Sequence, residues 1–213
     1  MALLRRLLLV AVGRPLARIF TGADLIDRHH LPTKGPAIVV ANHASHVDTL
    51  LLLTIFPART LERVRPAAAA DYFLKTPVMS WFSRNVIGIV PVARDKAAKG
   101  EDVLAPARDA LAAGDIVIVF PEGTRGDGEH ITRLKTGVAK LAAAFPEAPV
   151  TPIWLQGAGR VLPKGALLPV PMNCTVLVGE PFFWSGDRMA FMDTLRDRLE
   201  ALHAQAPPQR WAE

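Results

Sequence analysis

The chain has a single cysteine, Cys174, and lacks a long apolar run near its beginning, and both shortages narrow the classes of protein it can belong to. One cysteine excludes a disulfide framework within the chain and fits a reducing compartment, so we expect a thiol in the core. A membrane-spanning helix needs roughly 20 predominantly apolar residues. Within residues 1–20, which carry several arginines, the longest uncharged stretch is only Leu7 to Gly13. This part of the chain is therefore not expected to cross a bilayer.

The sequence also lacks the short motifs of several enzyme classes. It contains no G-x-S-x-G nucleophile elbow, no G-x-x-x-x-G-K-[ST] phosphate loop and no H-E-x-x-H metal-binding helix. Catalysis through a covalent acyl-serine is therefore unsupported. The basic residues are scattered, and no aromatic residues alternate with them as a stacking platform would require. We therefore expect no nucleic acid among the partners.

Length, charge and apolar content describe a basic globular domain. The 213 residues are enough for one domain with a full core. Half of the residues are apolar, the formal net charge is +5 and the pI is about 9.8. Such a charge favours anionic partners, and a lipid surface and a phosphorylated substrate both fit it.

From residue 35 onward, short apolar runs alternate with longer helical patterns. The expected strands are Ala37–Ala41, Val64–Ala68, Val86–Val90, Ile116–Phe120, Val150–Leu155 and Thr175–Val178. The expected helices are Val47–Phe56, Tyr72–Arg84, Asp102–Ala113, Thr136–Phe145 and a last one after Asp187. This alternation implies crossover connections, so we predict an α/β fold, a single domain with a largely parallel central sheet flanked by helices. We place this domain at residues 25–205, followed by a tail at 206–213.

Residues 1–24 are expected to form a separate membrane-associating segment. The first 20 residues contain four arginines, many leucines and no acidic residue. We interpret them as a short amphipathic helix that lies among lipid headgroups, with leucines in the acyl boundary. A secretory signal peptide, with Arg5 and Arg6 before its apolar core, is one alternative. An ordinary first helix packed on the domain is another.

The segment Asn42 to Asp48 places a histidine and a carboxylate five positions apart, just after an expected strand. An aspartate that holds one imidazole nitrogen leaves the other free to accept a proton, so His43 and Asp48 have the residue types of a general base. Five helical positions rotate a side chain by about 500°, so the two residues cannot share a helical face. We therefore expect His43 in a loop and Asp48 in the first turn of the next helix. His46 could complete a metal site with them, but no further histidine or cysteine cluster supports a metal, and none is expected.

Three cations follow other expected strands: Arg94, Arg125 and Lys135. Open α/β sheets bind ligands at the carboxyl ends of their strands. The planar fork of arginine matches phosphate oxygens, lysine adds a point charge, and helix amides after Lys135 would add to the same field. Each cation alone could be a surface residue. Together they predict an anion site.

Taken in order, these clusters resemble the glycerolipid acyltransferase family over roughly residues 25–180. The family motif N-H-x-x-x-x-D is met by Asn42, His43 and Asp48, and its second motif by Gly88 and Arg94, although Pro91 stands where an aromatic residue is common. The third motif, F-P-E-G-T-R, is complete at Phe120–Arg125, followed by Gly126 where many members have serine and by a K-x-G at Lys135–Gly137. The proline-containing fourth motif resembles Val150–Ile153.

This resemblance implies direct transfer of a fatty acyl group from acyl-CoA or acyl carrier protein to the free hydroxyl of a lysophosphatidic acid-like acceptor, giving phosphatidic acid. His43 would take the hydroxyl proton and Asp48 would orient the imidazole, with no cofactor beyond the thioester co-substrate. The implied substrate-binding residues are Arg94, Glu122, Gly123, Thr124, Arg125 and Lys135. The implied location is peripheral or monotopic, on the cytoplasmic side of a membrane. Another lysolipid acceptor, a lysophospholipid or a lyso-amino-acid lipid, and a non-catalytic lipid-binding module remain as alternatives.

Overall fold

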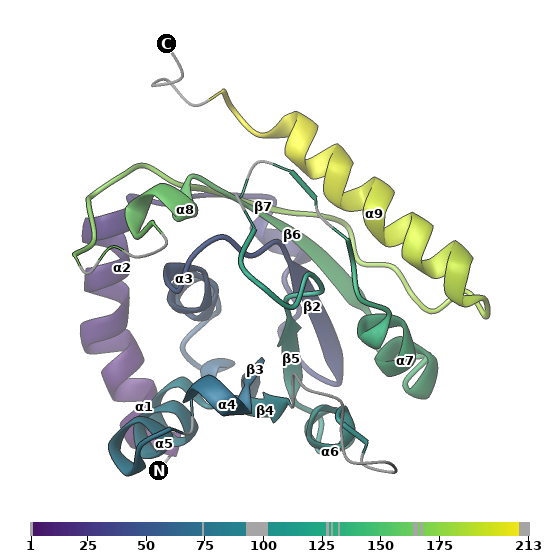
Figure 1. Cartoon of the computed structure of the whole chain (residues 1–213), viewed down its shortest axis with the longest axis horizontal. Coiled ribbons are helices and arrows are strands. Elements are labelled where there is room, and N and C mark those ends of the chain that lie inside the picture. The colour runs from purple at the N-terminus through teal and green to yellow at the C-terminus, as the bar shows by residue number, and fades with distance from the viewer. Residues whose placement is uncertain are drawn as a thin grey trace.

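The computed structural model of the chain shows one seven-stranded sheet with helices on both faces (Figure 1). It describes residues 2–73, 75–92, 102–126, 128, 130–131, 133–163, 166 and 168–208. The strands are β1 (Asp24–Ile26), β2 (Ala37–Ala41), β3 (Val64–Ala69), β4 (Val90–Val92), β5 (Ile116–Val119), β6 (Val150–Gln156) and β7 (Thr175–Val178). Their order is β1-β7-β6-β2-β5-β3-β4, and every pairing except β6 with β7 is parallel. The predicted α/β class is confirmed.

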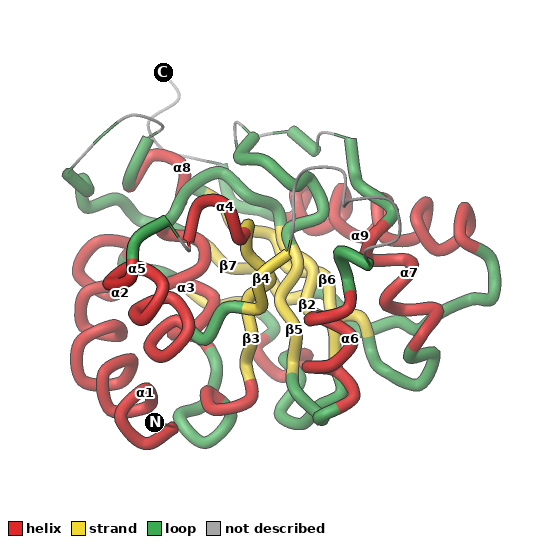
Figure 2. The backbone as a smooth tube through the Cα atoms, turned by 60° about the horizontal axis from the view of Figure 1, so that its bottom comes forward, coloured by secondary structure: helices red, strands yellow, loops and turns green. Residues whose placement is uncertain are grey.

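Helices lie on both sides of the sheet (Figure 2). The larger helices are α3 (Val47–Ile55), α6 (Ala105–Ala112), α7 (Gly137–Ala144) and α9 (Arg188–Gln205), and the shorter ones are α4 (Ala70–Phe73), α5 (Pro77–Phe82) and α8 (Ala158–Val161). Before β1, a continuous helical stretch is formed by α1 (Ala2–Leu8), a π-helical segment Leu9–Gly13 and α2 (Arg14–Thr21). We call residues 2–21 the first helix. Among the described residues, no helix has both the length and the apolar content needed to cross a bilayer.

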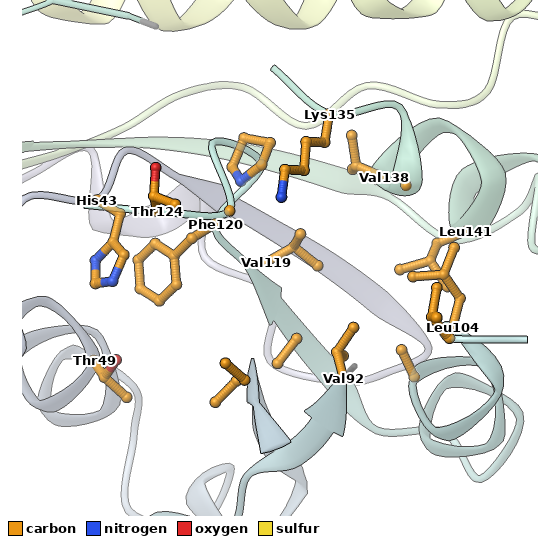
Figure 3. Close-up of a pocket in the computed structure, with 18 of the residues that line it drawn as sticks. His43, Thr49, Val92, Leu104, Val119, Phe120, Thr124, Lys135, Val138 and Leu141 are labelled. Atoms are coloured by element: carbon orange, nitrogen blue, oxygen red, sulfur yellow. The ribbon is translucent and has the colours of Figure 1, made fainter. Parts of the chain in front are cut away.

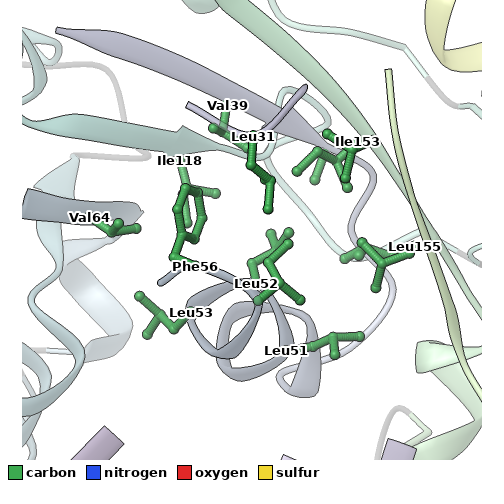
Figure 4. Close-up of a cluster of buried hydrophobic side chains, with 14 of the residues drawn as sticks. Leu31, Val39, Leu51, Leu52, Leu53, Phe56, Val64, Ile118, Ile153 and Leu155 are labelled. Atoms are coloured by element: carbon green, nitrogen blue, oxygen red, sulfur yellow. The ribbon is translucent and has the colours of Figure 1, made fainter. Parts of the chain in front are cut away.

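The core has two halves, one on each face of the sheet. Along β2, alternate residues serve opposite halves because successive strand side chains point to opposite faces. Ala37, Val39 and Ala41 pack on the α3 side, whereas Ile38 and Val40 pack on the side of α6, α7 and α9. Figure 4 shows the first half, where side chains of α3 meet those of the strands. A strand buried on both faces reads as a continuous apolar run, which is why β2 was predictable from sequence.

The parallel register places the loops that follow β2 and β5 side by side. Val40 pairs with Val119 at the ends of these two neighbouring strands. Three residues beyond that pair lie His43 on one chain segment and Glu122 on the other. The carboxyl edge of the sheet therefore brings two of the predicted site residues together through backbone register alone.

The predicted strand Val86–Val90 is wrong, because β4 begins only at Val90. Residues Ser83–Ile87 form a π-helical segment that continues α5 and ends at Gly88 in a left-handed conformation, with φ of 73°. Glycine adopts this conformation without steric cost and is therefore a common helix terminator. The apolar run looked like a strand because the helix end is buried.

The predicted helix Tyr72–Arg84 is divided in two. Its first part belongs to α4, and α5 starts afresh at Pro77. Thr76 provides the N-cap, since its Oγ1 accepts a hydrogen bond from Met79 N at 3.2 Å. Proline at the first helical position and a threonine cap are both strong start signals, and they outweigh the continuous apolar pattern.

Arg5 fastens the first helix to the domain from inside. Only 3% of its surface is exposed, and its guanidinium donates to the carbonyl oxygens of Leu61, Val64, Val86 and Ile87. Burial, with a smaller effect of Arg65, lowers the pKa of Arg5 to about 10, so the group is still charged at neutral pH. The expectation of a helix that lies among lipid headgroups is therefore wrong for the side chain of Arg5, which is buried in the domain.

The first helix has two different sides. Leu9 and Ala17 are buried against the domain, whereas Leu3, Leu7 and Ile19 are 54–64% exposed. The alternative of a helix packed on the domain thus describes its inner side. That its outer side faces lipid stays a prediction, and the exposed leucines are consistent with it.

We expect Arg5→Ala to destabilise the fold by about 2–4 kcal/mol, because buried carbonyl groups would lose their donor. For a chain of this size, that corresponds to a fall in Tm of roughly 5–15 °C in a thermal unfolding experiment. Arg6→Ala is the matched control. Arg6 is 41% exposed and pairs loosely with Glu62 at 3.6 Å, so its loss should cost less than about 1 kcal/mol. Equal Tm values for the two variants would contradict the stabilising role of Arg5.

Candidate active site

Asp48 organises the loop that carries His43. The fully buried Asp48 lies in the first turn of α3, and its Oδ2 accepts hydrogen bonds from Ala44 N at 2.7 Å and Ser45 N at 2.8 Å. His43 Nδ1 lies 2.8 Å from the same oxygen. The placement of His43 in a loop and Asp48 in the first helical turn agrees with the prediction from their spacing.

This geometry determines which imidazole nitrogen carries the proton. Because Oδ2 already accepts two backbone N–H groups, it acts as an acceptor toward His43 as well. Nδ1 of His43 is therefore the protonated nitrogen, and Nε2 has a free lone pair. His43 lines a cavity at this edge of the sheet, so a proton acceptor is available to a ligand there.

The backbone of His43 is held by the loop that follows β5. His43 N donates to Glu122 Oε1 at 2.9 Å, and His43 O accepts from Gly126 N at 2.8 Å. The ring of Phe120 stacks on the imidazole, with centroids 4.3 Å apart and planes 24° from parallel. The loop that follows β5 thus holds the histidine through three contacts, two to its backbone and one to its ring.

Asn42 fixes the other side of the same loop. Its Nδ2 donates to Leu155 O at 3.0 Å, and its Oδ1 accepts from Leu155 N at 2.7 Å. The side chain thereby replaces one step of the β2–β6 ladder, which ends where Ala41 pairs with Ile153. The strand pairing therefore ends before His43, and the backbone groups of His43 bond to the β5 loop instead.

The cavity beside His43 has a volume of about 720 Å³ and two chemically different ends (Figure 3). Near His43, its lining includes Thr124, Arg125 and Lys135. The opposite end lies between α6 and α7, where Leu104 and Leu141 line it. Between the two ends run apolar side chains from the ends of β3, β4 and β5, among them Ala68, Val92 and Val119. Such a cavity fits an amphiphile with an anionic group and an apolar chain.

Two of the three predicted cations, Arg125 and Lys135, come together in this cavity lining. Gly123 explains how the lysine reaches it: a Cβ at this position would lie 2.6 Å from Cε of Lys135, and its φ is 71°. Only glycine both adopts that conformation readily and leaves room for the lysine. The third cation, Arg94, lies outside the described residues.

Glu122, which the family resemblance implies as a substrate-binding residue, contacts the backbone of His43. It is 7% exposed and is absent from the cavity lining, whereas its neighbours Pro121, Gly123 and Thr124 contribute to it. Its Oε1 accepts the hydrogen bond from the backbone N–H of His43. Its implied role in substrate binding stays a prediction, and the geometry favours a role in positioning His43.

Neither a metal site nor a reactive thiol is evident in the part of the chain that the structure describes. No group of three or more histidine, cysteine or carboxylate side chains gathers there as metal ligands would. Burial, together with the negative charge of Asp48, raises the pKa of Cys174 to about 12. A thiol with such a pKa stays protonated, so Cys174 is a core residue, as expected from the sequence.

Sequence reasoning assigned no role to Asn42 and Phe120 beyond their place in the motifs. It also missed the apolar end of the cavity, because alanines and valines at strand ends and leucines on helices look like core residues. The one available signal was that β3 ends in the run Ala67–Ala69, whose small side chains leave space above the sheet.

The fold and site together define an α/β protein with a histidine–aspartate proton acceptor at the carboxyl edge of a largely parallel sheet, beside a cavity for an amphiphile. The sequence profile described as Acyltransferase matches residues 23–156. This match covers most of the chain, and the chain belongs to the acyltransferase family. The resemblance inferred from the motifs is thereby confirmed.

Two curated relatives show how far the likeness extends. A chloroplastic 1-acyl-sn-glycerol-3-phosphate acyltransferase of Brassica napus is 29% identical over 153 residues, which are 69% of this chain and 41% of that protein. The 1-acyl-sn-glycerol-3-phosphate acyltransferase alpha of Bos taurus is 28% identical over 174 residues, 80% of this chain and 58% of that one. The chain thus spans less than two thirds of the length of either relative.

A solved structure shares the fold. The crystal structure of PlsC from Thermotoga maritima, a 1-acyl-sn-glycerophosphate acyltransferase, superposes with a TM-score of 0.72 at 24% sequence identity. The match covers 96% of this chain and 83% of the Thermotoga chain. It confirms the architecture.

We expect Glu122→Ala to lower kcat about 10- to 100-fold and to leave the KM for the acceptor within about threefold. The backbone N–H of His43 would lose its buried acceptor. This loss would destabilise the loop that positions the imidazole by about 1–3 kcal/mol. Glu122→Gln keeps an acceptor oxygen in the same place and should retain kcat within about threefold. Steady-state kinetics of both variants separate the two roles. A raised acceptor KM with unchanged kcat in Glu122→Ala would instead support contact with the glycerol.

Proposed function

We propose that this protein is an O-acyltransferase that moves a fatty acyl group from an acyl thioester to the free hydroxyl of a lysophosphatidic acid-like acceptor, giving phosphatidic acid. The observation that carries the proposal is the cavity in which His43, Arg125 and Lys135 meet an apolar channel. A general base, an anion-binding rim and space for acyl chains are the three parts that this reaction needs.

The chemistry follows from the free nitrogen of His43. Nε2 accepts the proton of the acceptor hydroxyl as its oxygen attacks the thioester carbonyl carbon. The charge of Asp48, 2.8 Å from Nδ1, stabilises the imidazolium that forms. When the tetrahedral intermediate collapses, the C–S bond breaks and the imidazolium returns the proton to the departing thiolate. The products are an ester and a free thiol, and no acyl-enzyme is formed.

The two ends of the cavity would bind different parts of the substrates. Arg125 and Lys135 would hold the phosphate of the acceptor, because guanidinium and ammonium groups both pair well with phosphate oxygens. Arg94, from the second family motif, would join them. The apolar end between Leu104 and Leu141 would take an acyl chain, since burying hydrocarbon yields about 0.8 kcal/mol per CH₂ group. Either acyl-CoA or acyl carrier protein would serve as donor.

The substrates also suggest where the protein acts. Both carry long chains that partition into a bilayer, so a site at the membrane surface avoids extracting them into water. The exposed leucines of the first helix, which include Leu3 and Leu7, would lie in the interfacial region of that membrane. We accordingly propose a peripheral or monotopic location on the cytoplasmic side. Removing the whole first helix would be a poor test, because Arg5 and Leu9 are part of the fold.

The direct test is a panel of acceptors supplied to purified protein with an acyl thioester, in which release of free thiol is measured. We expect turnover with 1-acylglycerol 3-phosphate and at least tenfold less with 1-acylglycerol, which lacks the phosphate. His43→Ala should lower kcat by about 100- to 10,000-fold, the usual contribution of a general base. His46→Ala, a change three residues away in the same cavity lining, is the matched control.

Three outcomes would redirect the assignment. Retention of more than about a tenth of kcat in His43→Ala would remove the general base. A preference for a lysophospholipid with a larger headgroup, or for a lyso-amino-acid lipid, would keep the reaction but change the acceptor. Lipid binding without turnover by the unmodified protein would indicate a non-catalytic module.

A further inference from the structure

We propose that α5 is a second membrane-docking element, which inserts into an anionic lipid leaflet beside the first helix and holds the mouth of the cavity against that surface. The proposal rests on the proposed function only for the idea that the substrates come from a bilayer. The residues that support it, in α5, lie outside the four family motifs.

The first observation is that α5 presents an apolar surface to solvent. Val78 is 78% exposed, Trp81 50%, Phe82 48% and Met79 39%. No residue of this helix is buried. A helix with four exposed large apolar residues in six positions loses nothing from the core when it inserts into lipid, and it gains by removing this area from water.

Exposed apolar residues are concentrated on these two segments. Among the described residues, fifteen large apolar side chains are exposed, of which six belong to the first helix and four to α5. The six on the first helix are Leu3, Leu4, Leu7, Val12, Leu16 and Ile19. Scattered exposed apolar residues are normal, but a concentration on two adjoining elements marks an interaction surface.

The two segments are fixed to each other. The helical continuation of α5 ends at Val86 and Ile87, whose carbonyl oxygens accept hydrogen bonds from the Arg5 side chain at 3.1 and 2.8 Å. Figure 1 shows α5 beside α1 on the same flank of the molecule. These hydrogen bonds of Arg5 join α5 and the first helix into one surface rather than two independent anchors.

The charges on this surface identify the partner as an anionic lipid leaflet rather than another protein. Residues 2–21 and 72–92 contain no acidic residue. Lys75 and Arg84, which flank α5, are both exposed. Tryptophan next to cations is the pattern of a membrane interface, where the indole lies at headgroup level and basic side chains meet lipid phosphates.

The position of α5 links membrane docking to the cavity beside His43. It follows α4 closely along the chain, and Phe73 of α4 lines the cavity together with Ala69, the last residue of β3. Figure 2 shows α4 beside the strands and α5 next to α4, on the side of α2 and α3. Insertion of α5 would therefore set the α4 side of the cavity at the lipid surface, where an acyl chain could enter without crossing water.

The test is binding to vesicles of phosphatidylcholine with and without phosphatidylglycerol, measured by sedimentation. We expect Val78→Ser with Trp81→Ser to lower partition onto the anionic vesicles at least about tenfold, since two large apolar side chains are removed. Phe183→Ser with Met189→Ser is the matched control, because these residues are 53% and 71% exposed. Met189 belongs to α9 and Phe183 shortly precedes it, and Figure 1 shows α9 on the opposite flank of the molecule from α5. Leu7→Ser with Ile19→Ser gives the contribution of the first helix for comparison.

Partition of the α5 variant within about twofold of the unmodified protein would overturn the proposal. So would a dimer of the unmodified protein that the α5 variant converts to monomer while vesicle binding stays unchanged, because the surface would then join two copies of the chain. Neither readout needs turnover, so a failed acyltransferase assignment and a failed docking assignment are distinguishable.

A second measurement covers the case in which the double variant folds poorly. Vesicles with brominated acyl chains should quench part of the tryptophan emission of the unmodified protein, and Trp81→Phe should remove that quenched part. The other tryptophans, at positions 154, 184 and 211, provide the emission that remains. Equal quenching in the unmodified protein and Trp81→Phe would show that α5 stays out of the lipid.

Discussion

The site depends on one buried oxygen, Oδ2 of Asp48, which accepts hydrogen bonds from His43 Nδ1 and from the backbone of Ala44 and Ser45. The two backbone bonds fold the loop after β2 over the start of α3, and the third bond sets the tautomer of the imidazole. A buried carboxylate is stable only when such donors surround it. The same bonds thus build the loop and prepare the proton acceptor. The β5 loop then adds Glu122 and Phe120, which hold His43 from the opposite side.

Much of this arrangement could be predicted because it depends on local signals. The apolar runs of β2 and β7 gave the observed bounds of these strands, and the five-residue spacing of His43 and Asp48 required a loop followed by a helix. The meeting of Arg125 with Lys135 followed from a general property of parallel sheets, whose strand ends share one edge.

The features that escaped prediction depend on contacts between distant segments. Val86–Val90 has the composition of a strand, but the carbonyl groups of its first residues are satisfied by Arg5, more than 80 positions earlier in the chain. Arg5 itself looked like a lipid-facing residue, since nothing local shows that four carbonyl oxygens surround it. Likewise, nothing local indicates that Glu122 Oε1 accepts a hydrogen bond from the backbone of His43, because that contact depends on the β2–β5 register. Side-chain to backbone bonds of this range leave no periodic trace in a sequence.

The measurement that tests the central claim most directly is kcat of Asp48→Asn with the phosphorylated acceptor. Asparagine has the shape of aspartate but lacks the charge that stabilises the imidazolium, and its amide can hold His43 in the wrong tautomer. We predict a loss of at least about a hundredfold in kcat, with a Tm close to that of the unmodified protein and little change in acceptor KM. A kcat within about threefold of the unmodified value would contradict the account, because the histidine would then work without its buried partner.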